Sequence, residues 1–142
     1  MIDKQHLIDL KGVSKEFDGT RVLSNIDLYV RRKEFVTLLG PSGCGKTTTL
    51  RMIAGFEDLS DGEIHLCGRP VSIKSKNLYV PPEERGLGMV FQSFAVWPHM
   101  NIFENVAFGL RISKTPEKVI RERVSKMLSL VNLSGYESRH IS

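Results

Sequence analysis

The sequence predicts an α/β fold in which a phosphate-binding loop joins a strand to a helix. Residues 40–47 read Gly-Pro-Ser-Gly-Cys-Gly-Lys-Thr and fit the phosphate-loop pattern G-x-x-x-x-G-K-[ST] at every fixed position. An apolar run at residues 34–39 precedes this loop, and residues 48–54 have the pattern of a helix closed by Gly55. Alternating residues before this P-loop NTPase core and helical periodicity after residue 101 indicate an antiparallel β region followed by helices.

The N-terminal part predicts a β-hairpin. Residues 7–17 contain short alternating stretches, residues 21–23 and 25–30 resume the alternation, and an Asp-Gly pair at residues 18–19 supplies the turn. We expect the antiparallel β region to span residues 1–33.

The predicted nucleotide-binding core spans residues 34–92. Its first strand, residues 34–39, is apolar enough for a buried parallel strand. Residues 63–66 form a second short run, and residues 87–91 read as another buried strand. Gln92 follows that strand directly.

The loop residues suit a triphosphate because backbone N–H groups must converge on it without Cβ atoms in the way. The first amides of the following helix are unpaired and lie at its positive dipole end. Lys46 is expected to reach the β- and γ-phosphates, Thr47 to bind Mg²⁺ and Thr48 to donate to the α-phosphate. A chance match is disfavoured because both flanks agree with the motif. The other expected ATP-binding residues are Gly40, Ser42, Gly43, Cys44 and Gly45.

Residues 93–142 are expected to begin a helical subdomain. Asn101 with Glu104 resembles a capping box, and an apolar run continues to residue 110. A second helix is expected to follow, with Thr115 as its cap and Pro116 in its first turn. Its apolar face is expected to contain Ile120, Val124, Met127, Leu128 and Val131.

Composition excludes several classes of protein. The 142 residues suit one domain or slightly less, and 41% hydrophobic residues is typical of a globular core. No apolar run approaches the ~20 residues of a membrane span, and residues 1–6 lack signal-peptide features, so a cytoplasmic location is expected. Cys44 and Cys67 have no metal-ligand spacing. The net charge of +4 is interleaved with acids, so no nucleic-acid partner is expected.

Five segments in this order resemble the ATP-binding subunit of an ABC transporter, and the whole chain takes part in the match. The resemblance is greatest to importer ATPases that serve solutes such as ferric iron, polyamines, phosphonates and sugars. It implies an ATPase that uses ATP and Mg²⁺, works as a homodimer with membrane permease subunits, and lies on the inner face of the cell membrane. The segments are Lys15-Glu16-Phe17, residues 40–47, residues 61–64, residues 88–92 and residues 98–106.

The resemblance also implies roles for single residues. Phe17 occupies the adenine-stacking position, where tyrosine is more usual; packing within the hairpin is the alternative. Gln92 matches the glutamine that reaches Mg²⁺ and the attacking water, which makes Lys46 and Gln92 the expected catalytic residues; an ordinary loop amide is the alternative. Residues 93–101, from Ser93 to Asn101, resemble the surface that receives a permease helix, although Trp97 there could equally pack in a core.

Three elements of the family are missing from these residues. No run of four apolar residues ends in Asp-Glu, so the general base and one Mg²⁺ ligand are absent. Residues 133–135 read Leu-Ser-Gly, but Tyr-Glu follows instead of the rest of the signature, and neither His99 nor His140 matches the switch histidine. We therefore expect a truncated, N-terminal portion of one ABC ATPase domain that binds ATP without turning it over.

Two other classes share the phosphate loop. A P-loop kinase would need an acceptor site and basic lid residues, for which no specific pattern is found. An ATPase of the DNA-repair or chromosome type would be interrupted by a long coiled coil, and no sustained heptads occur. Downstream sequence with a signature and switch histidine would indicate the transporter, and a coiled coil the chromosome type.

Overall fold

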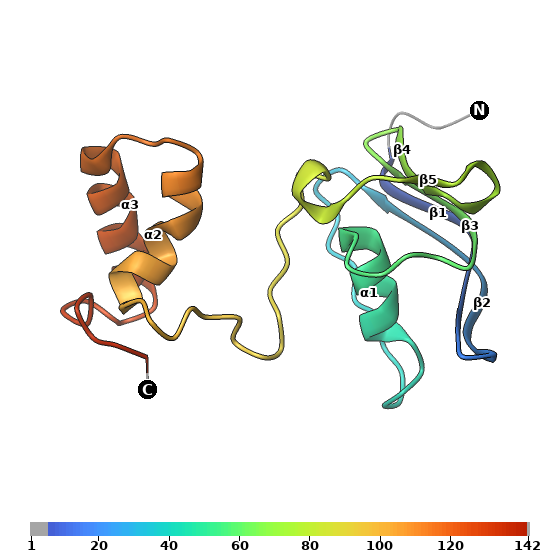
Figure 1. Ribbon diagram of the computed structural model, residues 1–142, viewed down its shortest axis with the longest axis horizontal. Helices are drawn as coiled ribbons and strands as arrows, with labels where there is room; N and C mark the ends of the chain where they lie inside the picture. The colour runs from blue at the N-terminus through green and yellow to red at the C-terminus, as the bar shows by residue number, and fades with distance from the viewer. Residues whose placement is uncertain (1–5, 142) are drawn as a thin grey trace. The chain divides into compact units, whose positions relative to one another are not determined.

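The chain divides into two units, Met1–Met89 and Val90–Ser142. The structure is a computed structural model that describes residues 6–141. A sheet and the helix α1 make up the first unit, and the helices α2 and α3 lie in the second (Figure 1). The three-part division expected from the sequence stays a prediction.

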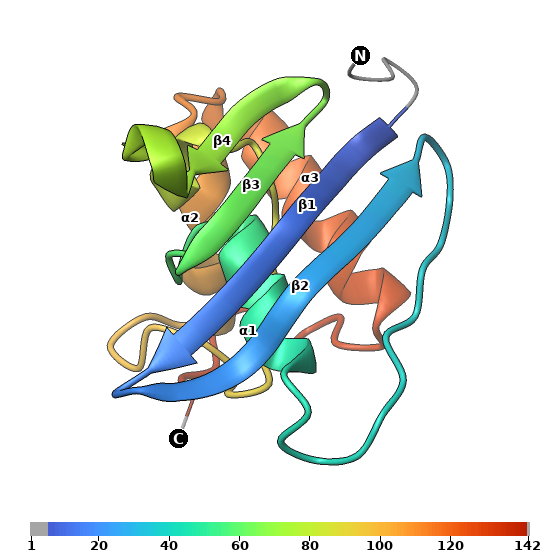
Figure 2. The ribbon, with the colours of Figure 1, turned by 90° about the vertical axis from the view of Figure 1, so that its right-hand side faces the viewer.

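An antiparallel sheet forms the frame of the first unit. Its five strands lie in the order β2-β1-β3-β4-β5, and each neighbouring pair is antiparallel (Figure 2). The antiparallel region predicted before the phosphate loop is confirmed, and it is extended by strands that follow the loop in sequence. The strands are β1 (His6–Phe17), β2 (Thr20–Arg31), β3 (Asp61–Leu66), β4 (Arg69–Ile73) and β5 (Leu78–Tyr79).

The predicted hairpin joins β1 to β2. Asp18 and Gly19 both have left-handed backbone conformations, with φ of 47° and 78°. Two such residues form the primed turn whose twist matches that of paired strands. Phe17 and Thr20 are the first pair of the ladder.

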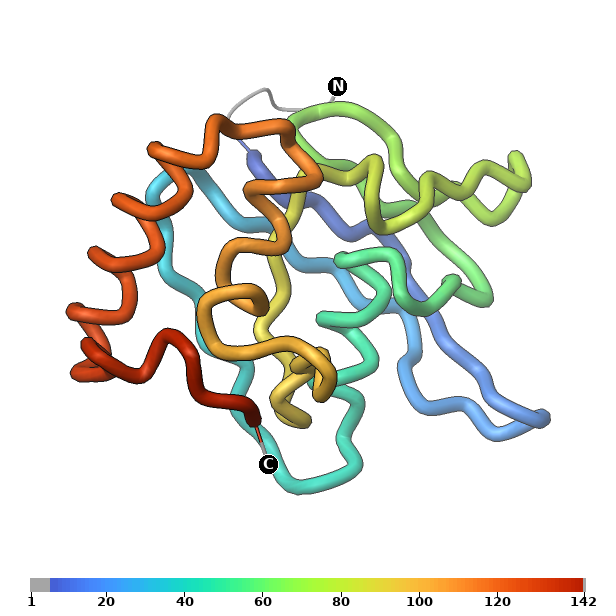
Figure 3. The backbone as a smooth tube through the Cα atoms, turned by 60° about the vertical axis from the view of Figure 1, so that its left-hand side comes forward, coloured from blue at the N-terminus to red at the C-terminus, as the bar shows by residue number. Residues whose placement is uncertain are grey.

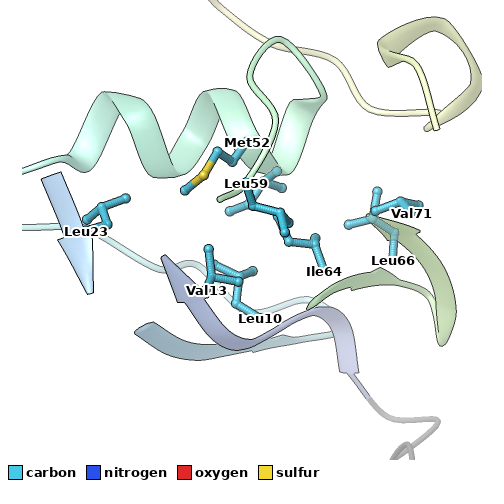
Figure 4. Close-up of a cluster of buried hydrophobic side chains, with 9 residues drawn as sticks. Leu10, Val13, Leu23, Met52, Leu59, Ile64, Leu66 and Val71 are labelled. Carbon is cyan, nitrogen blue, oxygen red and sulfur yellow. The ribbon is translucent and has the colours of Figure 1, made fainter. Parts of the chain in front are cut away.

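Helix α1 (Lys46–Ala54) carries the phosphate loop at its start. It ends at Gly55, as predicted, where φ is 86°. Its buried face, which includes Met52 and Ile53, packs with side chains of the sheet (Figure 4). The core of this unit consists of Leu10, Val13, Leu23, Met52, Ile53, Leu59, Ile64, Leu66 and Val71.

Two strand predictions are wrong. Residues 34–39 and residues 87–91 belong to no strand. Phe35 is 92% exposed and Leu39 is 96% exposed, so the first segment is not buried either. A buried parallel strand needs hydrogen-bonded neighbours and cover on both faces. In the part of the chain that the structure describes, the five strands pair only with one another, and none of them pairs with residues 34–39 or 87–91.

The second unit is a pair of helices, α2 (Ile102–Ile112) and α3 (Glu117–Leu130), that run in opposite directions (Figure 3). The predicted capping box is confirmed: Asn101 Oδ1 accepts from Glu104 N at 2.8 Å, and Glu104 Oε2 accepts from Asn101 N at 2.9 Å. Thr115 was expected to cap α3, but Pro116 is the N-cap. Pro116 has a non-helical ψ of 138°, so the helix begins at Glu117, one residue later than predicted, and among the described residues no side chain caps its start.

The core between these helices is narrow. It consists of Ala107, Ile120, Val124 and Leu128. Met127 and Val131 were expected on the same face but are 46% and 61% exposed. Contact with one neighbouring helix buries only positions four residues apart along α3, which leaves the flanking apolar positions uncovered. Within residues 6–141, no helix combines the length and apolar character needed to cross a membrane.

Candidate functional site

The phosphate loop, residues 40–47, leads directly into α1. Gly43 has φ of 82°, and Gly45, the N-cap of α1, has φ of 91°. Side chains disfavour both conformations, which glycine adopts without strain. Among the described residues, no side chain caps this helix. Its first amides are therefore available to an anion at the positive end of the helix dipole.

Gly45 also lets the loop approach β2 closely. A Cβ atom on Gly45 would lie 2.5 Å from Leu23 Cδ2, and one on Gly40 would lie 2.7 Å from Cys44 Sγ. These distances are too short for real atoms, so a side chain at Gly45 would force Leu23 to shift and one at Gly40 would force Cys44 Sγ to shift. Gly45 thus lets the start of α1 pack against β2, and Gly40 leaves room for the Cys44 side chain within the loop.

The ammonium group of Lys46 hydrogen-bonds back to the start of the phosphate loop. Its Nζ donates to the carbonyl oxygens of Gly40 and Pro41 at 2.8 and 2.6 Å, and it lies 3.4 Å from Cys44 Sγ. The positive charge is thus held among the loop's main-chain atoms, where phosphate oxygens could replace the carbonyls as its acceptors.

The hydroxyl groups of the loop and helix fall into two classes. Ser42 and Thr47 are exposed and Thr48 is half-buried. Thr49 is buried, and its Oγ1 donates to Gly45 O at 3.0 Å. Thr49 therefore secures the helix start, whereas binding of ATP and Mg²⁺ by Ser42, Thr47 and Thr48 stays a prediction.

Arg85, which the sequence analysis missed, holds the other end of α1. Its Nη1 donates to Met52 O at 2.8 Å and to Ile53 O at 3.0 Å. Its Nη2 donates to Ser72 Oγ at 3.0 Å, and its Nε donates to Val80 O at 2.7 Å. One guanidinium thereby ties the last turn of α1 to β4 and to the segment after β5. No local pattern could reveal this, because the partners lie up to 33 residues away in sequence.

Burial lowers the pKa of the Arg85 guanidinium, and the charges of Tyr79 and Asp58 oppose that shift. Arginine remains protonated in proteins, so the group keeps its charge at the negative end of the α1 dipole. A Cβ atom on Gly55 would lie 2.5 Å from Arg85 Nε, which explains why glycine is needed there.

Phe17 lies at the hairpin turn, which Figures 1 and 2 both show at the same end of the first unit as the phosphate loop. Phe17 is 39% exposed, and Lys15 Nζ lies 4.5 Å from the centroid of its ring. Lys15 itself pairs with Glu57 Oε1 at 2.7 Å. Stacking of Phe17 on a base stays a prediction.

Gln92 and residues 93–101 belong to the second unit. Gln92 is exposed, and its contact with Mg²⁺ stays a prediction. Trp97 is 47% exposed, and its ring centroid lies 5.5 Å from that of Phe108 and 6.1 Å from that of His99. Trp97 is therefore neither buried in a core nor fully free.

Known proteins are similar to this chain in sequence and in fold. A family model described as "ABC transporter" matches residues 23–142. The chain belongs to this family. It is 55% identical over 138 residues to a spermidine/putrescine import ATP-binding protein PotA of Clostridium acetobutylicum, and 51% identical over 137 residues to the PotA protein of Desulfitobacterium hafniense. These matches cover 97% and 96% of this chain but 38% of each relative.

The fold agrees with that assignment. A solved structure, cbiO1 of Clostridium perfringens, described as part of the ABC transporter complex cbiONQ, superposes with a TM-score of 0.75 at 24% identity. The match covers 96% of this chain and 54% of that protein. The expected fold class, the N-terminal part of an ABC ATPase domain, is confirmed even though two of its core strands are not formed.

Proposed function

We propose that this protein is the ATP-binding subunit of an ABC importer, which drives a solute across a membrane by binding and hydrolysing ATP. The observation that carries the proposal is the phosphate loop, with left-handed Gly43 and Gly45, an uncapped α1 and the Lys46 ammonium among the loop carbonyls. Membership of the ABC transporter family supports the same role.

The loop residues fit Mg²⁺-ATP, because the left-handed Gly43 and Gly45 lead into the first amides of α1, which no side chain caps among the described residues. Lys46 would bind the β- and γ-phosphates and Thr48 the α-phosphate, while the other phosphate contacts would come from the backbone of residues 40–45. Thr47 and Gln92 would hold Mg²⁺. The metal, when bound, would neutralise charge on the phosphate oxygens.

The partners we infer are a second copy of the subunit and a membrane permease. The permease would contact the docking loop, the name we give to residues 93–101. These contacts would hold the subunit at the inner face of the cell membrane. The relatives support this inference through their description as import ATP-binding proteins, as does the structural neighbour, which is described as part of a transporter complex.

A polyamine is the solute class we propose. The support is the name shared by the relatives from Clostridium acetobutylicum and Desulfitobacterium hafniense, which describes spermidine/putrescine import.

Uptake of labelled spermidine tests the proposed function. The full-length protein, expressed with its permease in cells lacking their own polyamine importers, should restore uptake. Lys46→Ala should abolish it, whereas Lys118→Ala, at an exposed position of α3, should not. If only another solute is restored, the solute class is wrong. If ATP binds normally but no solute enters, the importer role is wrong.

The 142 residues alone, we infer, bind Mg²⁺-ATP without turnover. They contain no Asp-Glu after an apolar run and no complete signature, so charge stabilisation and water activation are both lost. Phosphate release from the purified chain should be near background. Steady turnover of ~1 s⁻¹ or more, typical of ordinary enzymes, would contradict this inference.

A further inference from the structure

We propose that Asn105 is a positioning residue, which holds the docking loop in the conformation that presents Trp97 to a partner. The proposal rests on the proposed docking role of residues 93–101. Asn105 itself lies in the first turns of α2 and has not been assigned any role by the motifs above.

The side-chain amide of Asn105 hydrogen-bonds to the main chain of the docking loop through both its oxygen and its nitrogen. Its Oδ1 accepts from Trp97 N at 2.8 Å. Its Nδ2 donates to Trp97 O and Met100 O, each at 3.1 Å, and to Asn101 O at 3.0 Å. Two N–H groups thus serve three carbonyl oxygens, which requires one shared bond. Only a side-chain amide combines such donors with an acceptor, so smaller polar residues cannot replace it.

The first turn of α2, which carries Asn105, is held in place by hydrogen bonds. Its own backbone N donates to Asn101 O at 3.0 Å, and the capping box fixes the preceding turn through Asn101 and Glu104. The loop, in contrast, has no helix or strand from residue 93 to residue 100. The main chain of Trp97 is bound by the amide of Asn105 and by a backbone bond from Met100 N to its carbonyl oxygen, at 3.1 Å, and a bond from Ala95 N to Ser93 O lies just before it.

The ring of Trp97 completes the arrangement. Phe108 lies on α2 about one turn beyond Asn105, so residues on the same helix hold the indole and its backbone. With the main chain of Trp97 bound by Asn105 and its ring centroid 5.5 Å from that of Phe108, 47% of the residue remains exposed. This is the arrangement expected of an aromatic anchor that a partner can cover.

Amide hydrogen exchange of the 142-residue chain tests the positioning role. In Asn105→Ala the Trp97 N–H loses its acceptor, and its exchange should accelerate about fivefold to thirtyfold. The N–H groups of Ile102 and Phe103 provide an internal control, because they donate to Arg139 O and Glu137 O, each at 2.9 Å, and not to Asn105. Their exchange should be unchanged.

Fluorescence gives a second measurement, because Trp97 is the only tryptophan of the 142 residues. Asn105→Ala should shift the emission to longer wavelength and increase quenching by acrylamide. Asn105→Asp, which keeps the size and the acceptor but places a carboxylate against three carbonyl oxygens, should shift the emission in the same direction. Ser125→Ala, at an exposed position of α3, is the matched control. Unaltered emission and Trp97 exchange in both Asn105 variants would overturn the proposal.

Uptake by the full-length protein separates this proposal from the docking role. We expect Trp97→Ala and Asn105→Ala both to reduce uptake while ATP affinity stays unchanged. If Trp97→Ala transports normally although Asn105→Ala frees the indole, the docking role fails and the positioning of the loop stands. If Trp97→Ala loses uptake but Asn105→Ala keeps both uptake and loop order, the positioning role fails and docking stands.

Discussion

Lys46 is the residue whose charge matters most to the proposed site. Its ammonium now donates to Gly40 O and Pro41 O, and phosphate oxygens would be stronger, charged acceptors. Lys46→Ala should weaken ATP binding by about 1.5–3 kcal/mol, the range for a hydrogen bond to a charged group. Titration calorimetry measures the difference, with Lys118→Ala as the control. An unchanged affinity would remove Lys46 from the site.

Substitution of Phe17 can distinguish stacking of its ring on the nucleotide base from packing within the hairpin. Phe17 is 39% exposed, and Lys15 Nζ lies 4.5 Å from the ring centroid, so both stacking and packing have a physical basis. If the ring stacks on a base, Phe17→Ala should weaken ATP and GTP alike, and Phe17→Tyr should bind both normally, because stacking requires a π-face and little else. Equilibrium binding of fluorescent ATP and GTP analogues gives both affinities. Normal ATP binding by Phe17→Ala would favour packing in the hairpin.

At the scale of an element, α1 is secured at its last turn by Arg85. Arg85→Ala leaves buried acceptors, including Met52 O and Ser72 Oγ, without their donor. We expect the unfolding free energy to fall by about 2–5 kcal/mol. Urea unfolding followed by circular dichroism measures the loss. Arg121→Ala, which removes an exposed guanidinium 3.8 Å from Glu117, should have an effect of at most about 0.5 kcal/mol. Equal stability of the two variants would contradict the anchoring role.

The segment from Gln92 into the docking loop is the element we expect to couple nucleotide state to a partner. Gln92→Ala should reduce uptake by the full-length importer more than it reduces ATP affinity, because coupling free energy is lost while the phosphate contacts remain. Uptake and calorimetry on the same variant give the two effects. Equal losses, or uptake that is unaffected, would argue against coupling through Gln92.

At the scale of the whole chain, exposed apolar segments predict self-association. Phe35 and Leu39 in the first unit are 92% and 96% exposed, and Phe94 in the second unit is 90% exposed. Soluble monomers rarely expose such segments without a partner. Sedimentation velocity should detect oligomers of the 142-residue chain, and the double variant Phe35→Glu/Leu39→Glu should reduce them. Ser125→Glu adds charge elsewhere and serves as the control. A stable wild-type monomer would be the contrary result.

The parts of the fold that the sequence predicted correctly are those encoded by neighbouring residues. The Asp18-Gly19 turn, the Gly55 helix end and the capping box of Asn101 and Glu104 each involve residues within a few positions of one another. The glycines and Lys46 of the phosphate loop likewise form a short contiguous pattern. Local backbone preference and hydrogen bonding decide such features, so a single sequence is enough to find them.

The tertiary structure decided what depends on distant partners. Residues 34–39 have the composition of a buried strand, yet a strand forms only where other strands supply its hydrogen bonds. Arg85 binds carbonyls 32 and 33 residues away, and Asn105 binds a loop whose path no pattern encodes. The sequence by itself thus determined the family and the phosphate loop. The structure alone revealed what holds α1 and the docking loop in place, because Arg85 joins residues far apart in sequence and no sequence pattern encodes the path of the loop that Asn105 binds.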